Sequence, residues 1–298
     1  LSRGHILLED VPGVGKTTLA LAFSRAMGIE YRRVQFTPDV VPSDILGFSI
    51  YDKETGNLVY KPGAVMCNLL LADEINRTSS KTQSALLEVM EERQVSIDGV
   101  THALPDPFLV IATQNPVGAA GTQLLPQAQL DRFMARLKMG YPDFNSQVRI
   151  LRDRKGENPL NQVSQAVDAA AVRRMQGEVD SLNVADSIYE YITHLAQATR
   201  EHAVVQLGVS PRGALAVLKM AQAHAYVSGR DYVLPEDAAA VFGDVCAHRL
   251  VLSPKAKLAG KTAEEGRDDP ECQENECGLR RECLKFREFG IFYRRRTQ

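Results

Sequence analysis

The sequence predicts a two-domain α/β protein: a parallel sheet domain followed by a smaller all-helical domain. Over the first half of the chain, short apolar runs alternate with helical patterns, which is typical of a parallel sheet with crossover helices. A glycine-rich segment joins the first apolar run to the first helical pattern. After Pro142 only helical patterns follow, so we expect the strands to stop there.

The composition agrees with this fold class. At roughly 150 residues per domain, 298 residues suggest about two domains, and 44% hydrophobic with 24% charged residues is ordinary for a globular chain. A formal net charge of −2 gives no overall basic field for nucleic acid. No apolar run approaches the roughly 18 residues of a membrane span, and no secretory signal is visible. We expect a cytoplasmic protein, and the start at Leu1 suggests a missing N-terminal segment.

The first domain, residues 1–141, contains four expected strands and two expected helices. The strands are expected at residues 5–8, 33–36, 69–72 and 108–113, and the third of them is apolar on both faces, as in a central parallel strand. The helices are expected at residues 17–27 and 80–93. Two hairpins interrupt this rhythm, one at residues 48–60 around Gly56 and one at residues 95–103 around Asp98-Gly99, a strong hairpin turn signal.

The second domain, residues 142–258, is expected to be a helical lid. Its helical patterns lie near residues 146–154, 168–179, 184–201, 211–228 and 235–250. Residues 259–298 lack a core pattern and are expected to form a weakly ordered tail. The tail holds Cys272, Cys277 and Cys283, whose spacing is not the usual zinc spacing, so we interpret them as unligated.

The glycine-rich segment has the context of a phosphate-binding loop. It follows a strand, opens a helix and contains the run Pro12, Gly13, Val14, Gly15, Lys16, Thr17 and Thr18. The glycines allow backbone N–H groups to turn toward phosphate oxygens, Lys16 can reach the β- and γ-phosphates, and the Thr17 hydroxyl can bind Mg²⁺. The usual pattern has Gly where this chain has Asp10. The alternative is a strand–helix turn that binds no nucleotide.

Polar residues come directly after two of the later expected strands. Asp73 and Glu74 follow the strand at residues 69–72, and Asn115 follows the strand at residues 108–113. Beside a phosphate loop, Asp73 would hold Mg²⁺ or its water and Glu74 would polarise the attacking water. Asn115 could lie between the γ-phosphate and that water. The alternatives are a solvated strand end for the acidic pair and an Asn-Pro turn for Asn115.

Taken together, the phosphate loop, Asp73-Glu74 and Asn115 resemble the Walker A, Walker B and sensor 1 motifs of an AAA+ ATPase. The amino-acid sequences of three segments resemble those of the MoxR family in particular. The segments are residues 9–13, 71–77 and 112–116. Residues 130–133 and 210–212 resemble the arginine-finger and sensor 2 segments of that family, which makes Arg132 and Arg212 candidate catalytic residues. The resemblance covers about residues 1–258.

The resemblance implies a P-loop AAA+ domain with a helical lid that binds ATP and Mg²⁺ and assembles into a ring, expected to be a hexamer. It also implies chaperone-like maturation of a protein client, including metal or cofactor insertion, with a partner that carries a von Willebrand factor A domain. The two hairpins match the helix-2 and pre-sensor-1 insertions of this clade. The tail departs from the family, and we expect that the family's adenine-covering N-terminal segment is missing from this sequence.

The two arginines also have simpler interpretations. Ser210 is a good N-cap and Pro211 suits the first helical position, so Arg212 lies in the first turn of a helix, where it could reach the nucleotide or simply face solvent. Arg132 could equally be an ion-paired surface residue.

Three other functions compete with client remodelling. One is a nucleic-acid motor. The near-neutral charge and the few aromatic residues in the hairpins argue against a motor, whereas Lys53 and Lys61 in the first hairpin argue for it. Another is a magnesium-chelatase-like ATPase subunit. A third is a nucleotide-binding scaffold without turnover, against which the intact Lys16, Asp73, Glu74 and Asn115 argue.

Overall fold

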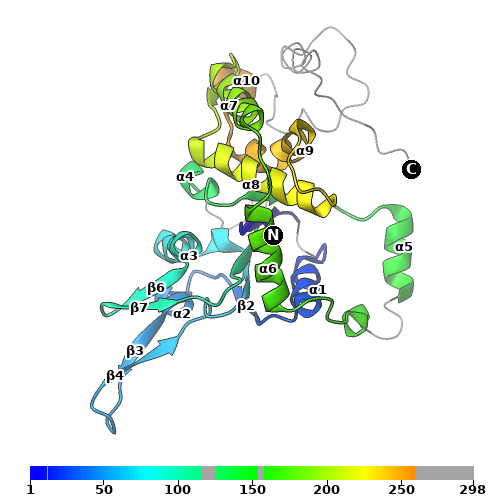
Figure 1. The fold of residues 1–298 in the computed structure, drawn as a ribbon. Helices are drawn as coiled ribbons and strands as arrows, with labels where there is room; N and C mark the ends of the chain where they lie inside the picture. The colour runs from blue at the N-terminus through cyan, green and yellow to red at the C-terminus, as the bar shows by residue number, and fades with distance from the viewer. Residues whose placement is uncertain (12, 116–124, 154–157, 259–298) are drawn as a thin grey trace. The chain divides into compact units, whose positions relative to one another are not determined.

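A computed structural model describes residues 1–11, 13–115, 125–153 and 158–258 (Figure 1). Pro12, the tail at residues 259–298 and the three tail cysteines lie outside the described residues. Apart from Ser2, the described chain forms two compact units that divide between Glu178 and Val179.

The first unit is built on a five-stranded sheet. Its strands are β1 (Ile6–Glu9), β2 (Tyr31–Gln35), β5 (Leu69–Asp73), β8 (Leu109–Gln114) and β9 (Ala135–Leu137). They lie in the order β2-β5-β8-β1-β9, and every pair is parallel. The predicted parallel sheet is therefore confirmed. The strand β9 was not predicted, because at three residues it is too short to show a pattern of its own.

Residues of the interior strand β5 alternate between two apolar layers. Leu69 and Leu71 pack in one cluster with Ala20 of α1 (Lys16–Met27). Leu70 and Ala72 pack in the other with residues of α3 (Ser80–Glu92), such as Leu86. All four β5 residues are fully buried, which confirms the expectation of a strand that is apolar on both faces.

Both predicted hairpins form. The first pairs β3 (Gly47–Tyr51) with β4 (Leu58–Pro62) and follows the short helix α2 (Pro42–Leu46). The second pairs β6 (Gln94–Ile97) with β7 (Val100–Ala103). Asp98 and Gly99 both have positive φ, 50° and 78°, as a two-residue type I′ turn requires. The rings of Tyr60 and His102 stack 3.9 Å apart and join the hairpins.

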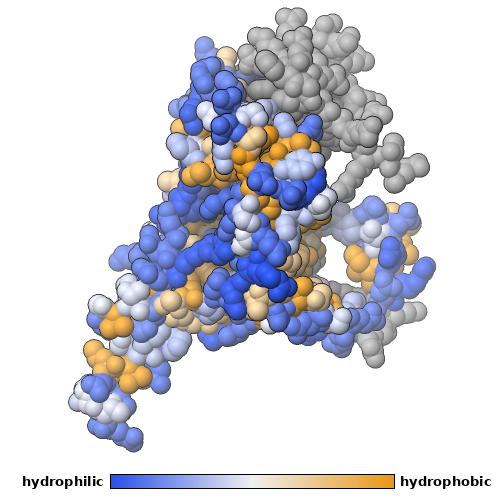
Figure 2. Space-filling model, in the orientation of Figure 1, coloured by the Kyte–Doolittle hydropathy of each residue, from blue (hydrophilic) through white to orange (hydrophobic). Residues whose placement is uncertain are grey.

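Apolar side chains lie exposed on the β3–β4 hairpin (Figure 2). They are Phe48, Ile50, Tyr51, Leu58 and Val59. A two-stranded hairpin has no layer of its own to cover such side chains. This surface is therefore available to contact another molecule.

The segment after β9 stays with the first unit for longer than the sequence boundary at residue 142 implied. It contains α5 (Phe144–Asp153), η2 (Pro159–Gln162) and α6 (Ala169–Asp180), whereas the short helix α4 (Gln127–Leu130) lies before β9. The N–H groups of Ala166 and Val167 both donate to the carbonyl of Ala26 at the end of α1. These long-range bonds hold the segment to the sheet unit, a contact that local periodicity does not reveal.

The second unit is mainly helical. Its elements are α7 (Asp186–Glu201), α8 (Pro211–Val227), α9 (Pro235–Cys246), η3 (Ala247–Arg249) and α10 (Pro254–Leu258), together with the short antiparallel strands β10 (Val205–Leu207) and β11 (Val251–Leu252). The small strand pair was not expected, since the sequence analysis placed no strand after Pro142. Within the described residues, no helix has both the length and the hydropathy to traverse a bilayer.

Candidate active site

The glycine-rich loop connects β1 to α1 with an unusual backbone. Gly13 and Gly15 have φ of 87° and 97°, a region that side chains other than glycine rarely adopt. Within the described residues, a Cβ atom on either glycine would meet no atom within 4 Å, so both face open space there. Gly15 is the N-cap of α1, and no side chain in the described part of the chain caps the helix. The N-terminus of α1 is therefore suited to an anion.

Lys16 lies folded against this loop. Its side chain is buried, and Nζ donates to the carbonyl oxygens of Asp10 at 2.8 Å and Val11 at 3.3 Å. Thr17 and Thr18 follow in the first turn of α1 and are partly exposed, as is Val14. The described part of the predicted loop thus lies at the end of β1.

Asp10 has a role that the sequence analysis missed. Its Oδ2 accepts hydrogen bonds from the N–H groups of Met139 and Gly140 at 2.6 and 2.7 Å, and its Oδ1 accepts one from Val11 at 2.9 Å. Partial burial would raise the pKa of Asp10, but these three backbone donors outweigh it and lower the pKa. The carboxylate therefore fastens the entry of the phosphate loop to the chain leaving β9, a function that glycine could not supply.

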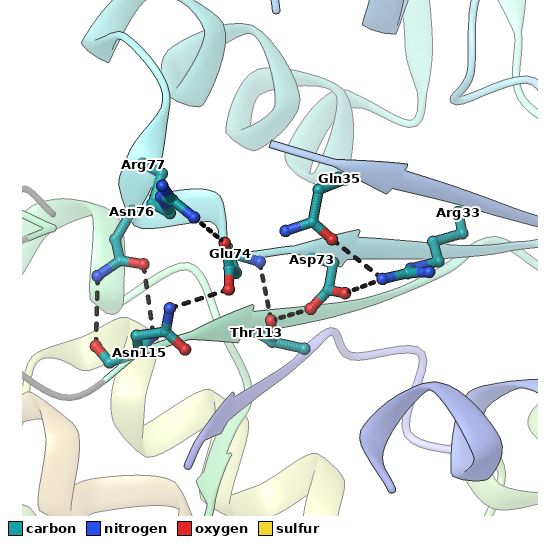
Figure 3. Close-up of polar contacts among 8 residues, drawn as sticks. All are labelled: Arg33, Gln35, Asp73, Glu74, Asn76, Arg77, Thr113 and Asn115. Carbon is teal, nitrogen blue, oxygen red and sulfur yellow. Dashed lines mark hydrogen bonds and ion pairs between the residues drawn. The ribbon is translucent and has the colours of Figure 1, made fainter. Parts of the chain in front are cut away.

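Asp73 ends β5 within hydrogen-bond reach of the neighbouring strands (Figure 3). The Thr113 hydroxyl on β8 donates to its Oδ1 at 2.6 Å, and Arg33 on β2 donates to its Oδ2 at 2.7 Å. Arg33 also donates to Gln35 at 3.0 Å. The carboxylate is therefore oriented from both sides, and Arg33 partly balances its charge.

Glu74 and Asn115 meet across β5 and β8. Asn115 donates from Nδ2 to Oε1 of Glu74 at 3.0 Å, and Arg77 donates to Oε2 at 2.8 Å. The N–H of Glu74 donates to the Thr113 hydroxyl at 2.8 Å. Burial would raise the pKa of Glu74, but the hydrogen bonds from Arg77 and Asn115 lower it below its usual value. Glu74 is therefore held as a carboxylate.

The two side chains predicted to bind magnesium are chemically suited to that ion. A carboxylate and a hydroxyl, those of Asp73 and Thr17, are hard oxygen ligands of the kind that Mg²⁺ prefers. Among the described residues, no group of three or more His, Cys, Asp or Glu side chains converges to hold a metal. Mg²⁺ in nucleotide sites needs few protein ligands, because phosphate oxygens and water complete its shell.

Arg132 lies away from this cluster. It precedes β9, toward the amino ends of the parallel strands, whereas the acidic pair follows a strand at their carboxyl ends. Its Nε pairs with Glu91 at 3.4 Å, beside an open groove of about 500 Å³ between α3 and α4. Glu91 lies eleven residues beyond Ser80, or about 17 Å along α3. Arg132 is thus remote from Glu74 of the same chain.

Two other arginines have distinct positions. Arg136, a neighbour of Arg132 in sequence, pairs with Glu9 at 3.3 Å between β9 and β1. Arg212 lies in the first turn of α8, in the second unit, where the Ser210 hydroxyl accepts the Gly213 N–H at 3.0 Å. The predicted N-cap is confirmed, and the role of Arg212 stays a prediction.

Comparisons with known proteins agree with this geometry. Residues 5–135 match the ATPase family associated with various cellular activities (AAA), and residues 197–270 match the AAA lid domain. The chain is 44% identical over 262 residues to chaperone MoxR1 of Mycobacterium tuberculosis, covering 85% of this chain and 69% of that protein. It belongs to the MoxR family of AAA+ ATPases. The predicted fold class and ATP hydrolase activity are therefore confirmed.

Two further proteins are similar to this chain over most of its length. An uncharacterized Bacillus subtilis protein, YeaC, is 50% identical over 264 residues, which is 89% of this chain and 82% of that protein. A solved structure of a protein assigned as an ATPase, from Cytophaga hutchinsonii, is 40% identical with a TM-score of 0.82, covering 89% of this chain and 83% of that one.

Several polar residues of this MoxR-family site have contacts that the sequence did not predict. Thr113 bridges Asp73 and Glu74, and Asn76 holds the backbone of Asn115 through both amide atoms, at 3.3 and 3.4 Å. Arg77 follows Glu74 closely, so spacing could have indicated it. The contacts of Thr113 depend on the pairing of β5 with β8.

Proposed function

We propose that the chain binds Mg²⁺–ATP at the phosphate loop and uses hydrolysis to remodel or mature a protein client. One observation carries the proposal. The loop, the acidic pair and Asn115 follow β1, β5 and β8, and β8 lies between the other two in a parallel sheet. All three segments therefore meet at the carboxyl edge, where α/β folds bind ligands.

Each residue has a proposed role at this edge. Lys16 and the N–H groups of the loop hold phosphate oxygens, and Thr17 and Asp73 hold Mg²⁺, which neutralises phosphate charge when bound. Glu74 polarises the attacking water, and Asn115 orients Glu74. Arg212 of the lid and Arg132 of a neighbouring subunit add positive charge during transfer.

The client is proposed to be a protein. MoxR1 is named a chaperone, and the exposed side chains on the strands β3 and β4 themselves are apolar apart from Lys61. Apolar side chains favour protein surfaces over a phosphate backbone. We further propose a hexameric ring in the cytoplasm and a partner with a von Willebrand factor A domain, both on the family resemblance.

Two substitutions separate binding from chemistry. Lys16→Ala should weaken ATP binding, because the lysine contacts the ground-state phosphates. Glu74→Gln should keep ATP affinity but lower turnover by about 10² or more, because the amide cannot take up a proton from water. Calorimetric titration and a phosphate-release assay measure the two effects. Wild-type turnover in a calorimetrically verified Glu74→Gln complex would remove Glu74 from its role.

The same assay tests the client class. Duplex and single-stranded DNA should leave the rate of ATP turnover unchanged at low salt. A salt-sensitive rise on adding DNA would favour a nucleic-acid motor instead.

A further inference from the structure

Arg77 is the last residue of a single 3₁₀ turn, η1 (Ile75–Arg77), that begins directly after Glu74. Glu74 has a positive φ of 57°, which turns the chain sharply at the end of β5. The N–H of Arg77 then donates to the carbonyl of Glu74 at 2.9 Å. This tight turn brings the guanidinium back to the carboxylate, with Nη1 2.8 Å from Oε2.

The two oxygens of Glu74 are held by different parts of the chain. Arg77 of η1 holds Oε2, and Asn115, after β8, holds Oε1 at 3.0 Å (Figure 3). The final torsion of a glutamate side chain is broad and poorly determined by its own rotamer preference. One donor on each oxygen therefore sets the plane of this carboxylate.

A stabilising role does not account well for this contact. The side chain of Arg77 is 41% exposed, and exposed ion pairs contribute little to stability, about 0–1 kcal/mol. Arg174 and Glu178 on α6 form a comparable exposed pair at 3.9 Å, far from any residue of the candidate site in sequence. The pair at Glu74 differs because its acid is mostly buried, with 18% of its side chain exposed, and shares a second donor.

We infer that Arg77 is a positioning residue that orients the Glu74 carboxylate toward the attacking water. The inference rests on the proposed role of Glu74. A polarising carboxylate acts only in a narrow range of orientations, and a misplacement of about 1 Å can cost 10²-fold in rate. Without Arg77, Asn115 alone holds the carboxylate, which can then rotate about the remaining bond.

Three variants test this inference in the full chain. Arg77→Met keeps the aliphatic stem but removes the donor, Arg77→Lys keeps a charged donor, and Arg174→Met is the matched control at the remote pair. The measurements are kcat and KM for ATP, the Kd of a fluorescent ATP analogue and assembly with ATP by light scattering. Thermal unfolding verifies that each variant is folded.

Arg77→Met should lower kcat roughly tenfold, less than the 10²-fold cost of a large misplacement, and leave the Kd within about twofold. Arg77→Lys should recover at least half of the lost rate, and Arg174→Met should match the wild type. Wild-type kcat in Arg77→Met would overturn the inference, as would a Kd that weakens in step with kcat. Loss of assembly in Arg77→Met would also overturn the inference, because Arg77 would then be a subunit contact. A kcat of Arg77→Lys no higher than that of Arg77→Met would overturn it as well.

The Glu74→Gln variant separates this inference from the function on which it rests. If Glu74→Gln hydrolyses ATP normally, the proposed role of Glu74 fails. If Glu74→Gln is inactive while Arg77→Met is fully active, only the role of Arg77 fails.

Discussion

A single buried residue, His5, is expected to make the free energy of unfolding depend on pH. Its ring is almost completely buried. Nδ1 accepts the N–H of Val110 on β8 and Nε2 donates to the carbonyl of Met90 on α3, both at 2.9 Å. Burial lowers the pKa of His5 to about 4, from 6.5 in an unfolded chain. Between these values the unfolded state binds the extra proton, so the free energy of unfolding decreases as pH falls.

The free energy of unfolding is expected to be about 2 kcal/mol lower at pH 5 than at pH 7.5. This value follows from about 1.36 kcal/mol for each unit of pKa difference between the folded and unfolded states. Urea unfolding of the wild type and of His5→Gln at both pH values measures it. Glutamine keeps an acceptor and a donor but does not titrate, so the variant should lose about 2 kcal/mol less than the wild type. Equal losses in the two proteins would mean that His5 does not cause the acid sensitivity.

At the scale of a helix, two glycines should respond to alanine in opposite directions. A Cβ on Gly213 of α8 would lie 2.7 Å from Cγ1 of Val209 and 2.9 Å from Cδ of Arg249, whereas one on Gly177 of α6 would meet nothing within 4 Å. Overpacking costs about 1–3 kcal/mol, more than the 0.8–1 kcal/mol that alanine gains in helix propensity. Gly213→Ala should therefore lower the melting temperature and Gly177→Ala should raise it. A higher melting temperature for Gly213→Ala would contradict the close packing at the start of α8.

At the scale of the whole molecule, Arg132 is expected to complete the site of a neighbouring subunit. It lies near the amino ends of the strands, pairs with Glu91 and is remote from Glu74 of its own chain. Arginine suits a role in trans because its fork pairs with two phosphate oxygens, and such fingers contribute 10³ to 10⁵ in rate in GTPases. ATP turnover should then rise faster than linearly with protein concentration, because monomers lack the finger.

Mixing two inactive variants provides the direct test. Arg132→Ala and Lys16→Ala should each be inactive alone, but a mixed ring places an intact arginine beside an intact phosphate loop, so some turnover should return. Arg136→Ala is the comparison, because Arg136 pairs with Glu9 inside the sheet unit. Mixtures that assemble by light scattering but stay inactive at every ratio would exclude the trans role of Arg132.

Local patterns in the sequence were sufficient for much of this protein. Alternating apolar runs predicted the parallel sheet, Asp98-Gly99 predicted a hairpin, and Ser210 before Pro211 predicted a helix start, and all three are confirmed. These features depend on residues that are neighbours in the chain, so hydrophobic period and turn chemistry determine them. The phosphate loop and the acidic pair were visible for the same reason.

Tertiary structure alone decided the partners of those residues. Thr113 reaches Asp73 across forty positions because β5 and β8 pair side by side, and the carboxylate of Asp10 takes two of its three donors from residues some 130 positions away. The three-residue β9 forms because it pairs with β1 at the edge of the sheet. Residues after position 142 belong to the sheet unit because hydrogen bonds connect them to the end of α1. Sequence patterns record what each segment prefers by itself, whereas these contacts arise only when distant segments have packed together.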